Sequence, residues 1–395
     1  MKKVISKNKL PIKMWLDDME SGAIDQASNL ANLPFAFKHI AIMPDAHQGY
    51  GMPIGGVMAT KGVIIPNAVG VDIGCGMCAV KTSLTNIEIG SLKNILGEIR
   101  RQIPVGFNKH KKNQDDKLLP GSNDFINYRE EQWESTVISQ QLENARKSIG
   151  TLGGGNHFIE IQKGDDGHIW IMIHSGSRNL GFTVAKHYND LAKKLNKKWH
   201  TSIPTEYDLA FLPLDSEEGQ DYIKEMNYCV EFALANRELM MDRVSKIFGE
   251  FTNWGGTSHL INIAHNYAVM ESHYGENVMV HRKGATLARK GTIGIIPGSQ
   301  GTKSYIVEGL GNKESFESCS HGAGRTMGRK QAERELDLAE QTKILDDQGI
   351  LHGIRGRGDL DEAPGAYKDI QTVMDNQKDL VKILVELSPL AVVKG

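Results

Sequence analysis

Glycine is the residue that most constrains how this chain can fold. The 395 residues include 42 glycines, about 11% against a usual share of about 7%. They gather in tight clusters, GYGMPIGG, GTLGGGNH, HGAGR and GIRGRGD, with no break in composition between them. Glycine is needed where the backbone takes a positive φ or closely approaches a ligand. The clusters therefore predict sharp turns converging on one site in a single domain, residues 1–395. A domain boundary inside 107–124 is the competing interpretation.

Hydrophobic periodicity predicts an α+β fold, a compact domain of mixed β-sheets flanked by helices. Short strands separated by Gly/Pro turns are expected through the first 80 residues. Further strands are expected at 158–162, at 169–175 and across 277–307, and helices at 83–101, 130–150, 215–251, 325–346 and 367–387. The segment 106–124 is expected to be a polar loop.

Composition and charge exclude several classes of protein. The net charge is −2, so a nucleic-acid role would need local basic patches. No window approaches 18 apolar residues, and the N-terminus lacks the apolar run of a secretory signal, so no membrane span or membrane partner is expected. Four cysteines are too few for a disulfide framework in so long a chain. We therefore expect a cytoplasmic protein with free thiols.

The stretch VGVDIGCGMCAV places Asp72 three residues before Cys75, which lies between Gly74 and Gly76. Thiolate is a soft metal ligand and carboxylate a hard one, and the two glycines would leave room around the sulfur for a metal. A buried free cysteine in a turn is the plain alternative. Cys78 completes a C-x-x-C, but with no second such pair a structural zinc site is not expected.

Four histidines lie where an apolar element meets small or polar residues: His157, His174, His265 and His321. One such histidine is usually a hydrogen-bonded turn or core residue. Together with the carboxylate and the thiol, the four supply six donors, enough for two metal ions that share the thiolate. Paired metals stabilise the attacking and leaving oxygens in phosphoryl transfer.

Glycine-rich turns that could hold phosphate accompany these donors. PGSQGTKSY, residues 297–305, offers backbone N–H groups and hydroxyls near Lys303, and HGAGR, residues 321–325, precedes an expected helix N-terminus. Basic residues cluster at 108–113, 281–291 and 354–359. Each cluster could be solvated surface, but beside a phosphate site they are candidate tracks for a polynucleotide backbone.

Eight ordered motifs resemble the RtcB family of RNA-splicing ligases: PDAHQGYGMPIGGV, NAVGVDIGCGM, GTLGGGNHFIEI, HSGSRNLG, PGSQGTKSY, HGAGR, DEAPGAYKD and VVKG. They run from about residue 40 to the last residue. The resemblance implies a ligase that joins an RNA 3′-phosphate, or a 2′,3′-cyclic phosphate after opening, to a 5′-hydroxyl end, in tRNA splicing or RNA repair. It also implies GTP, with GMP bound covalently as an intermediate, and two Mn²⁺ ions, whereas a thiolate and imidazoles by themselves favour zinc or cobalt. It leaves open whether an archease-type activator takes part.

The resemblance also assigns residues. Cys75 would bridge both metals, with Asp72 and His157 completing one ligand set and His174 and His265 the other, and His321 would be the nucleophile that accepts GMP. Glu160 and Lys394 would contact the guanine edge and Tyr367 would stack on the base. The residues expected to line the guanylate site are Asn156, His157, Phe158, Ile159, Glu160, His265, Asn266, Pro297, Gly298, Ser299, Gln300, Ser304, His321, Gly322, Ala323, Gly324, Tyr367 and Lys394.

Arg178 and Arg325 are candidate clamps for phosphate or RNA. Two other functions remain alternatives. A dinuclear-metal phosphodiesterase or phosphatase acting on RNA ends would use the same ligands with water as the nucleophile. A non-catalytic RNA-binding scaffold would not need six metal donors, and the chain lacks the interleaved aromatic residues typical of single-strand binders.

Overall fold

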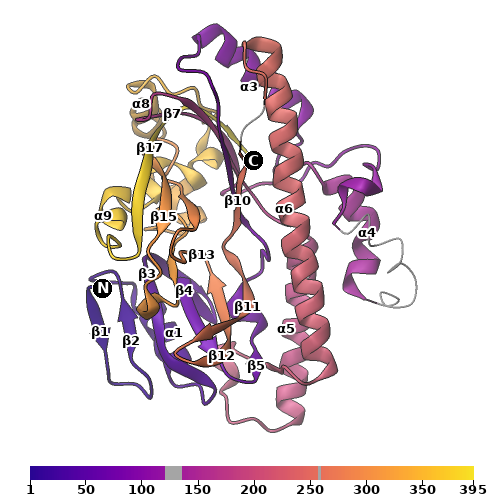
Figure 1. Cartoon of the computed structure of the whole chain (residues 1–395), viewed down its shortest axis with the longest axis vertical. Coiled ribbons are helices and arrows are strands. Elements are labelled where there is room, and N and C mark those ends of the chain that lie inside the picture. Colours follow the sequence, from indigo (N-terminus) through magenta and orange to yellow (C-terminus); the bar gives the residue numbers. More distant parts are fainter. Residues whose placement is uncertain (121–135, 257–258) are drawn as a thin grey trace.

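Two β-sheets organise the chain, which is seen here in a computed structural model that describes residues 1–120, 136–256 and 259–395 (Figure 1). The six-stranded sheet has the order β1 (Lys3–Ile5), β2 (Ile12–Met14), β3 (Ala36–Tyr50), β4 (Met52–Thr60), β12 (Glu276–Lys283) and β11 (Asn266–His273). The seven-stranded sheet has the order β10 (Ile261–Ala264), β6 (Gly76–Lys81), β8 (Ile169–Ser175), β7 (Phe158–Gly164), β17 (Val381–Lys394), β15 (Ser304–Gly309) and β14 (Ile293–Ile296). Two small ladders pair β13 (Ala285–Leu287) with β16 (Ser318–Ser320) and β5 (Val63–Ile64) with β9 (Leu212–Pro213).

Helices cover the sheets and each other. They are α1 (Ser21–Ala31), α2 (Pro66–Val69), α3 (Ile89–Gln102), α4 (Val137–Ser148), α5 (Leu180–Lys198), α6 (Glu217–Phe251), α7 (Arg329–Glu335), α8 (Leu338–Asp346) and α9 (Ile370–Asp375). In Figure 1, α6 runs along one side of the molecule as its longest element, with α3 near one end and α5 near the other. The mixture of sheets and covering helices confirms the α+β class expected from the sequence, whereas the single domain over 1–395 remains a prediction.

Strands β6, β7 and β8 lie inside the seven-stranded sheet, and both of their faces are buried. Ile159 and Ile161 of β7 point into a core shared with α3 and α6, while Phe158 on the other face joins a core formed with Leu345 and Leu360. Successive side chains of a strand alternate between faces, so the second face also receives Glu160. Glu160 lines a cavity that lies against this face of the sheet.

Helix α6 confirms the helix expected over 215–251. The Ser216 hydroxyl accepts the Gly219 N–H, and Glu217 and Glu218 occupy the first turn, where carboxylates interact favourably with the helix dipole. Its 35 residues span about 52 Å at 1.5 Å per residue. That length lets one helix pack against α3, α5, β6 and β8.

The expectation of one helix over 367–387 is wrong except for the short helix α9. Only α9 is helical there, and β17 begins at Val381 and pairs with β15 on one side and β7 on the other. Val, Ile and Leu are frequent in this segment, and either a helical or a strand periodicity would bury them. Pairing with the distant strands β7 and β15 therefore decides that the segment forms a strand.

Other boundaries also differ from expectation. The helix expected over 83–101 begins at Ile89, and the helix α1 was not anticipated. The helix expected over 325–346 is divided into α7 and α8, because the Asp337 side chain accepts the Glu340 N–H and starts a new helix. Residues 121–135, which include parts of the expected loop 106–124 and helix 130–150, lie outside the described residues, and α4 ends at Ser148, two residues before Gly150.

Candidate active site

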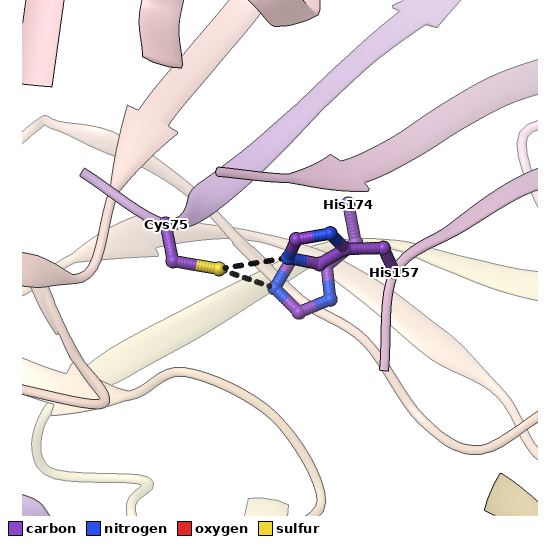
Figure 2. A group of neighbouring side chains, drawn as sticks. All are labelled: Cys75, His157 and His174. Carbon is purple, nitrogen blue, oxygen red and sulfur yellow. Dashed lines mark hydrogen bonds between the residues drawn. The ribbon is translucent and has the colours of Figure 1, made fainter. Parts of the chain in front are cut away.

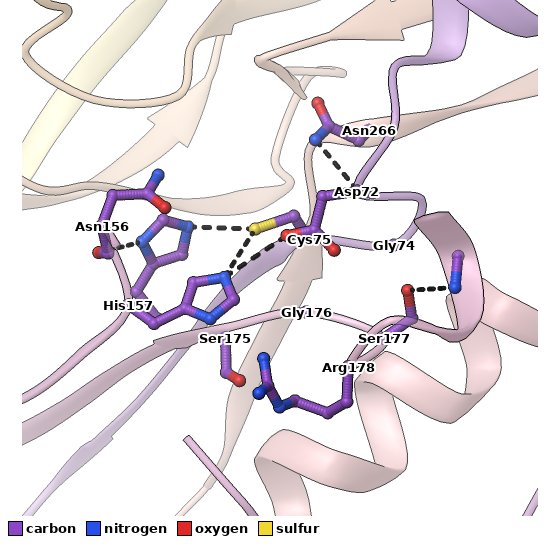
Figure 3. A network of polar contacts seen from close by, with 12 residues as sticks. Asp72, Gly74, Cys75, Asn156, His157, Ser175, Gly176, Ser177, Arg178 and Asn266 are labelled. Carbon is purple, nitrogen blue, oxygen red and sulfur yellow. Dashed lines mark hydrogen bonds and ion pairs between the residues drawn. The ribbon is translucent and has the colours of Figure 1, made fainter. Parts of the chain in front are cut away.

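Three neighbouring antiparallel strands bring one thiol and two imidazoles together. Cys75 immediately precedes β6, His174 lies on β8 opposite Met77 of β6, and His157 immediately precedes β7. The Cys75 Sγ lies 3.5 Å from His157 Nε2 and 3.3 Å from His174 Nε2, and Figure 2 shows one nitrogen of each ring facing the sulfur. The Asp72 Oδ2 lies 3.3 Å from His157 Nε2 (Figure 3). His157 and His174 thus both contact the Cys75 sulfur, although they follow it by 82 and 99 positions in the sequence.

Backbone carbonyls fix the tautomers of both imidazoles. The His157 Nδ1 lies 3.0 Å from the Leu152 carbonyl oxygen, and the His174 Nδ1 lies 3.0 Å from that of Asn156. A carbonyl only accepts, so each Nδ1 carries the proton and each Nε2 directs a lone pair at the sulfur. Such an outer hydrogen bond is what orients a metal-bound histidine.

Burial and charge govern the protonation of the acidic partners. Burial, reinforced by the Asp72 carboxylate, raises the pKa of the Cys75 thiol well above its ordinary value. Burial opposes ionisation of Asp72 as well, but hydrogen bonding and charge from His157 lower its pKa to about 2. A carboxylate and two imidazole lone pairs thus surround a buried sulfur that only a nearby cation would keep ionised.

His265 extends this group toward His321. Its backbone N–H donates to the Cys75 carbonyl at 2.8 Å, and its ring centroid lies 5.3 Å from that of His174 and 4.8 Å from that of His321. Its Nδ1 is buried and has no hydrogen-bond partner among the described residues. Burial and the neighbouring His321 lower the pKa of His265 well below its ordinary value, so the ring is neutral and able to act as a ligand.

The donor set fits a transition metal. Within the described chain, Cys75, His157 and His174 offer three ligand atoms within 4.8 Å of one another, and Asp72 adds a carboxylate to His157. Thiolate with imidazole is the set that soft or borderline metals prefer. His265 is not part of that compact group, so the structure brings four of the five predicted ligands together and leaves the fifth at its margin.

The two glycines beside Cys75 serve packing rather than space around the sulfur. A Cβ on Gly74, whose φ is +78°, would lie 2.8 Å from the backbone of Cys229 and Val230 on α6. A Cβ on Gly76 would lie 2.0 Å from the Ile263 carbonyl oxygen on β10. The expectation that these glycines make room for a metal is therefore wrong, because helix and strand backbones fill that space.

A cavity of about 780 Å³ opens beside the thiol and imidazoles. The predicted guanylate residues on its wall are Asn156, Phe158, Glu160, His265, Asn266, Pro297, Gly298, Ser299, Gln300, His321, Gly322, Ala323, Gly324, Tyr367 and Lys394. The Ile159 side chain instead packs in the core on the other face of β7. Ser304 is buried and its hydroxyl accepts the Gly298 N–H at 3.1 Å, so this side chain stabilises the loop 297–304 and does not line the cavity.

Asp45 is a residue that the sequence motifs did not single out. Its carboxylate is fully buried, and Oδ2 lies 2.6 Å from His321 Nδ1 while accepting the backbone N–H of His321 at 3.1 Å and of Gly322 at 3.3 Å. Nδ1 lies at ion-pair distance from the carboxylate but makes no hydrogen bond within the described residues. An acid inside the buried run HIAIMPDAH was the available signal, since a buried carboxylate needs partners.

The far wall of the cavity is a charged network around Glu362. Its carboxylate accepts from Arg325 Nη1 at 2.8 Å, from Arg329 Nε at 2.6 Å and from the Tyr367 hydroxyl. Burial raises the pKa of Glu160 well above its ordinary value, and burial lowers that of Lys394. Glu160 Oε1 has no hydrogen-bond partner within the described ranges, so this wall presents a buried polar atom without a protein partner.

Several predicted anion features are wrong in detail. The N–H groups of Gly298 and Ser299 already donate to the hydroxyls of Ser304 and Thr302, and Lys303 pairs with Glu386. HGAGR does not precede a helix directly, because α7 begins at Arg329, and its first N–H groups bind Asp45.

The two candidate arginine clamps already have protein partners. Arg325 binds Glu362, and Arg178 donates to Thr151 Oγ1 at 3.1 Å and to the Gly106 carbonyl at 3.3 Å. Arg325 still lines the cavity, whereas Arg178 helps to hold the loops beside the site.

The fold and the site together define an α+β protein with a candidate metal site of thiol and imidazole donors beside a cavity. The family model described as "tRNA-splicing ligase RtcB" matches residues 26–395, and the chain belongs to the RtcB family. It is 41% identical to the RNA-splicing ligase RtcB of Escherichia coli K12, over 98% of this chain and 97% of that protein. It is 32% identical to the tRNA-splicing ligase RtcB of Thermococcus kodakarensis, over 98% and 95% of the two chains. None of the described helices is long and apolar enough to cross a membrane.

Proposed function

We propose that this protein is an RNA ligase that joins a 3′-phosphate or 2′,3′-cyclic phosphate end to a 5′-hydroxyl end, using GTP and two Mn²⁺ ions. Family membership and the names of the relatives support RNA joining. One structural observation carries the proposal for this chain. His321, held by a buried carboxylate, faces the same cavity as the thiol–imidazole donors.

In the proposed first step, His321 Nε2 attacks the α-phosphorus of GTP, a P–N bond forms, and pyrophosphate leaves with the electrons of the broken P–O bond. The Asp45 carboxylate beside Nδ1 would offset the positive charge that develops on the ring. A metal bound by Asp72, Cys75, His157, His174 and His265 would supply Lewis-acid stabilisation of phosphate charge. In this proposal Asp45 positions the nucleophile, through the backbone N–H groups of His321 and Gly322, and stabilises its developing charge.

In the following steps an oxygen of the RNA 3′-phosphate attacks the phosphorus of the histidine-bound GMP, and His321 leaves. The 5′-hydroxyl then attacks the activated 3′-phosphate and GMP leaves. Glu160, Lys394 and Tyr367 all line the cavity, and we expect the first two to bind the edge of the base and Tyr367 to cover its face. A carboxylate that accepts from two N–H donors favours guanine, because adenine offers no matching pair.

The test is to join two oligonucleotides, one with a 3′-phosphate and one with a 5′-hydroxyl, with GTP or ATP and a panel of divalent metals. The expected result is a joined product that requires GTP and is best with Mn²⁺. Equal joining with ATP, or joining without any nucleotide, would contradict the proposal. Release of the 3′-phosphate as inorganic phosphate, without joining, would instead support the dinuclear-metal phosphatase.

A further inference from the structure

One aromatic side chain is fully exposed on the segment that follows α3. Phe107 has a relative exposure of 103%, the highest among the exposed large apolar residues. It lies in the segment after α3, immediately after Gly106, whose φ is +63°. Burial of apolar surface stabilises folding, so a phenylalanine left wholly in water contributes nothing to stability in this way. Exposed aromatic rings are useful where another planar group stacks on them.

The residues that follow Phe107 are basic, and their lysines form no ion pair with the part of the chain that the structure describes. Residues 107–114 contain three lysines and no acid, and Lys109, Lys111 and Lys112 are all exposed. Lys109 donates to the neutral Asn144 side chain at 3.2 Å. The nearest acids along the chain serve other groups, because Asp115 accepts the Lys117 N–H and Asp116 pairs with Arg146.

This aromatic and basic loop is attached to the metal-binding centre by its backbone. The Gly106 N–H donates to the Gly153 carbonyl at 2.8 Å, and the Leu152 N–H donates to the Pro104 carbonyl at 3.0 Å. Leu152 is the residue whose carbonyl fixes the tautomer of His157. On its other side, the glycine loop contacts Arg329, since a Cβ on Gly155 would lie 2.9 Å from Arg329 Nη2, and Arg329 lines the cavity.

The other two basic stretches do not have this combination. Within 281–291, His281 and Arg282 are buried in the core and Lys283 is buried at the cavity wall, so these three cannot form the expected surface track. Arg289 and Lys290 are exposed, but Arg289 pairs with Glu317 at 3.0 Å. Within 354–359, Arg355 donates to carbonyls of its own loop, and Asp359 lies in the same stretch. Among the exposed large apolar residues of the described ranges, none falls in either stretch.

We propose that Phe107 with Lys109, Lys111 and Lys112 forms the surface that holds single-stranded RNA next to the end being joined. The ring stacks on one base and the lysines follow the phosphates, the combination that single-strand binders use without sequence preference. The opposite charges of a lysine track and a phosphate backbone, together with the exposed ring, distinguish RNA from a protein partner. The inference depends on the proposed RNA joining, because it names the path of that substrate.

The experiment measures binding of a fluorescent single-stranded RNA of about 12 nucleotides with a 3′-phosphate, by anisotropy over a series of salt concentrations. The variants are Phe107→Ala, Phe107→Trp and the triple variant K109A/K111A/K112A. The matched control is K3A/K7A/K9A, which removes three exposed lysines from the first strand and its turn. Labelling of each protein by α-labelled GTP without RNA checks that the nucleotide step is unchanged.

Phe107→Ala should weaken binding by about 5- to 100-fold with the salt slope unchanged, and Phe107→Trp should restore it. The lysine triple variant should lower the slope of log K against log salt by about 2, or about 0.7 for each lysine removed. The lysine control should match the parent. Parental binding by both Phe107→Ala and the triple variant, in a parent that binds and joins RNA, would overturn this inference alone. A parent that neither binds nor joins RNA would overturn the proposed function itself.

Discussion

Two groups of buried polar side chains in this molecule are built in opposite ways. In the Glu271 cluster, formed by Glu271, His273, Arg282 and Ser318, every contact joins a donor to an acceptor. Arg282 donates to Glu271 at 2.7 and 3.0 Å, to Ser318 Oγ at 2.9 Å and to the Phe316 carbonyl at 3.0 Å. His273 Nε2 lies 2.8 Å from the same carboxylate. Burial opposes ionisation of Glu271, but His273 and Arg282 lower its pKa to about 2.

In the thiol–imidazole centre, formed by Cys75, His157, His174 and His265, lone pairs outnumber protons, because a single thiol proton can be donated to only one of the two Nε2 atoms that face it. The two fixed imidazole nitrogens point at a sulfur, and His265 Nδ1 has no partner in the described ranges. Both groups are equally buried. Unsatisfied lone pairs, rather than burial of polar atoms, therefore distinguish a ligand site from a structural network.

The largest effect is expected at His321. His321→Ala should abolish the protein–GMP label from α-labelled GTP and overall joining, because the imidazole removed is the proposed acceptor of GMP. The adduct of the parent should be stable in base and labile in acid. The variant should still seal an RNA whose 3′-phosphate already carries GMP, which distinguishes a nucleophile from a metal ligand. Label acquired by His321→Ala would contradict this role.

Cys75→Ala should lower the joining rate by about 100-fold or more and reduce the bound metal, since the sulfur is central to the donor set. Metal content by mass spectrometry and joining assays measure both effects. Cys78→Ala, a change at an equally buried thiol that faces Arg237, is the matched control and should retain its metal. Parental metal content and joining in Cys75→Ala would show that the centre does not bind metal through the sulfur.

Arg282→Met should have the opposite profile. It leaves the Glu271 carboxylate buried without its main partner and should lower the free energy of unfolding by about 3–5 kcal/mol. Joining per folded molecule should stay within about twofold of the parent, because Arg282 does not line the cavity. Urea denaturation and assays at low temperature separate the two quantities. A stable but inactive variant would contradict the distinction between the two groups.

Stability should fall in acid through His281, which adjoins Arg282 on β12. His281 Nε2 accepts the Ile65 N–H at 3.0 Å, and burial lowers its pKa to about 4 from an ordinary 6.5. The unfolded chain binds the proton more readily between these values. The contribution is therefore complete above pH 6.5 and is lost as the pH falls toward 4, by about 3 kcal/mol.

Unfolding in urea at pH 7 and at pH 4.5 measures this loss, and His281→Gln should reduce the difference. The reduction should be partial, because burial also lowers the pKa of His39 to about 4. An unchanged pH dependence in His281→Gln would show that His281 is not responsible.

The smallest effect is expected at Glu160. Glu160→Gln should weaken the use of GTP by about 1–3 kcal/mol, seen as a lower kcat/KM for nucleotide transfer, because one acceptor for a guanine donor is lost in a buried site. Use of ATP should change less, so the GTP-to-ATP ratio should fall. An unchanged ratio would mean that Glu160 does not contact the base.

Much of this protein was determined by sequence alone. The motifs indicated the family, and they named Cys75, His157, His174 and His321 before any geometry. Strands β7 and β8 and helix α6 also followed from the sequence, because each has its own hydrophobic period and end signals within a few residues.

Only the tertiary structure decided the rest. It showed that the backbones of α6 and β10 pack against Gly74 and Gly76, and that the Asp45 carboxylate contacts His321. It also showed that the three basic residues at 281–283, expected on the surface, are buried. It also made a strand of the segment from Val381 onward. The physical reason is common to all four. Each depends on which distant segment packs against a residue, and sheet pairing across hundreds of positions leaves no local periodicity to reveal it.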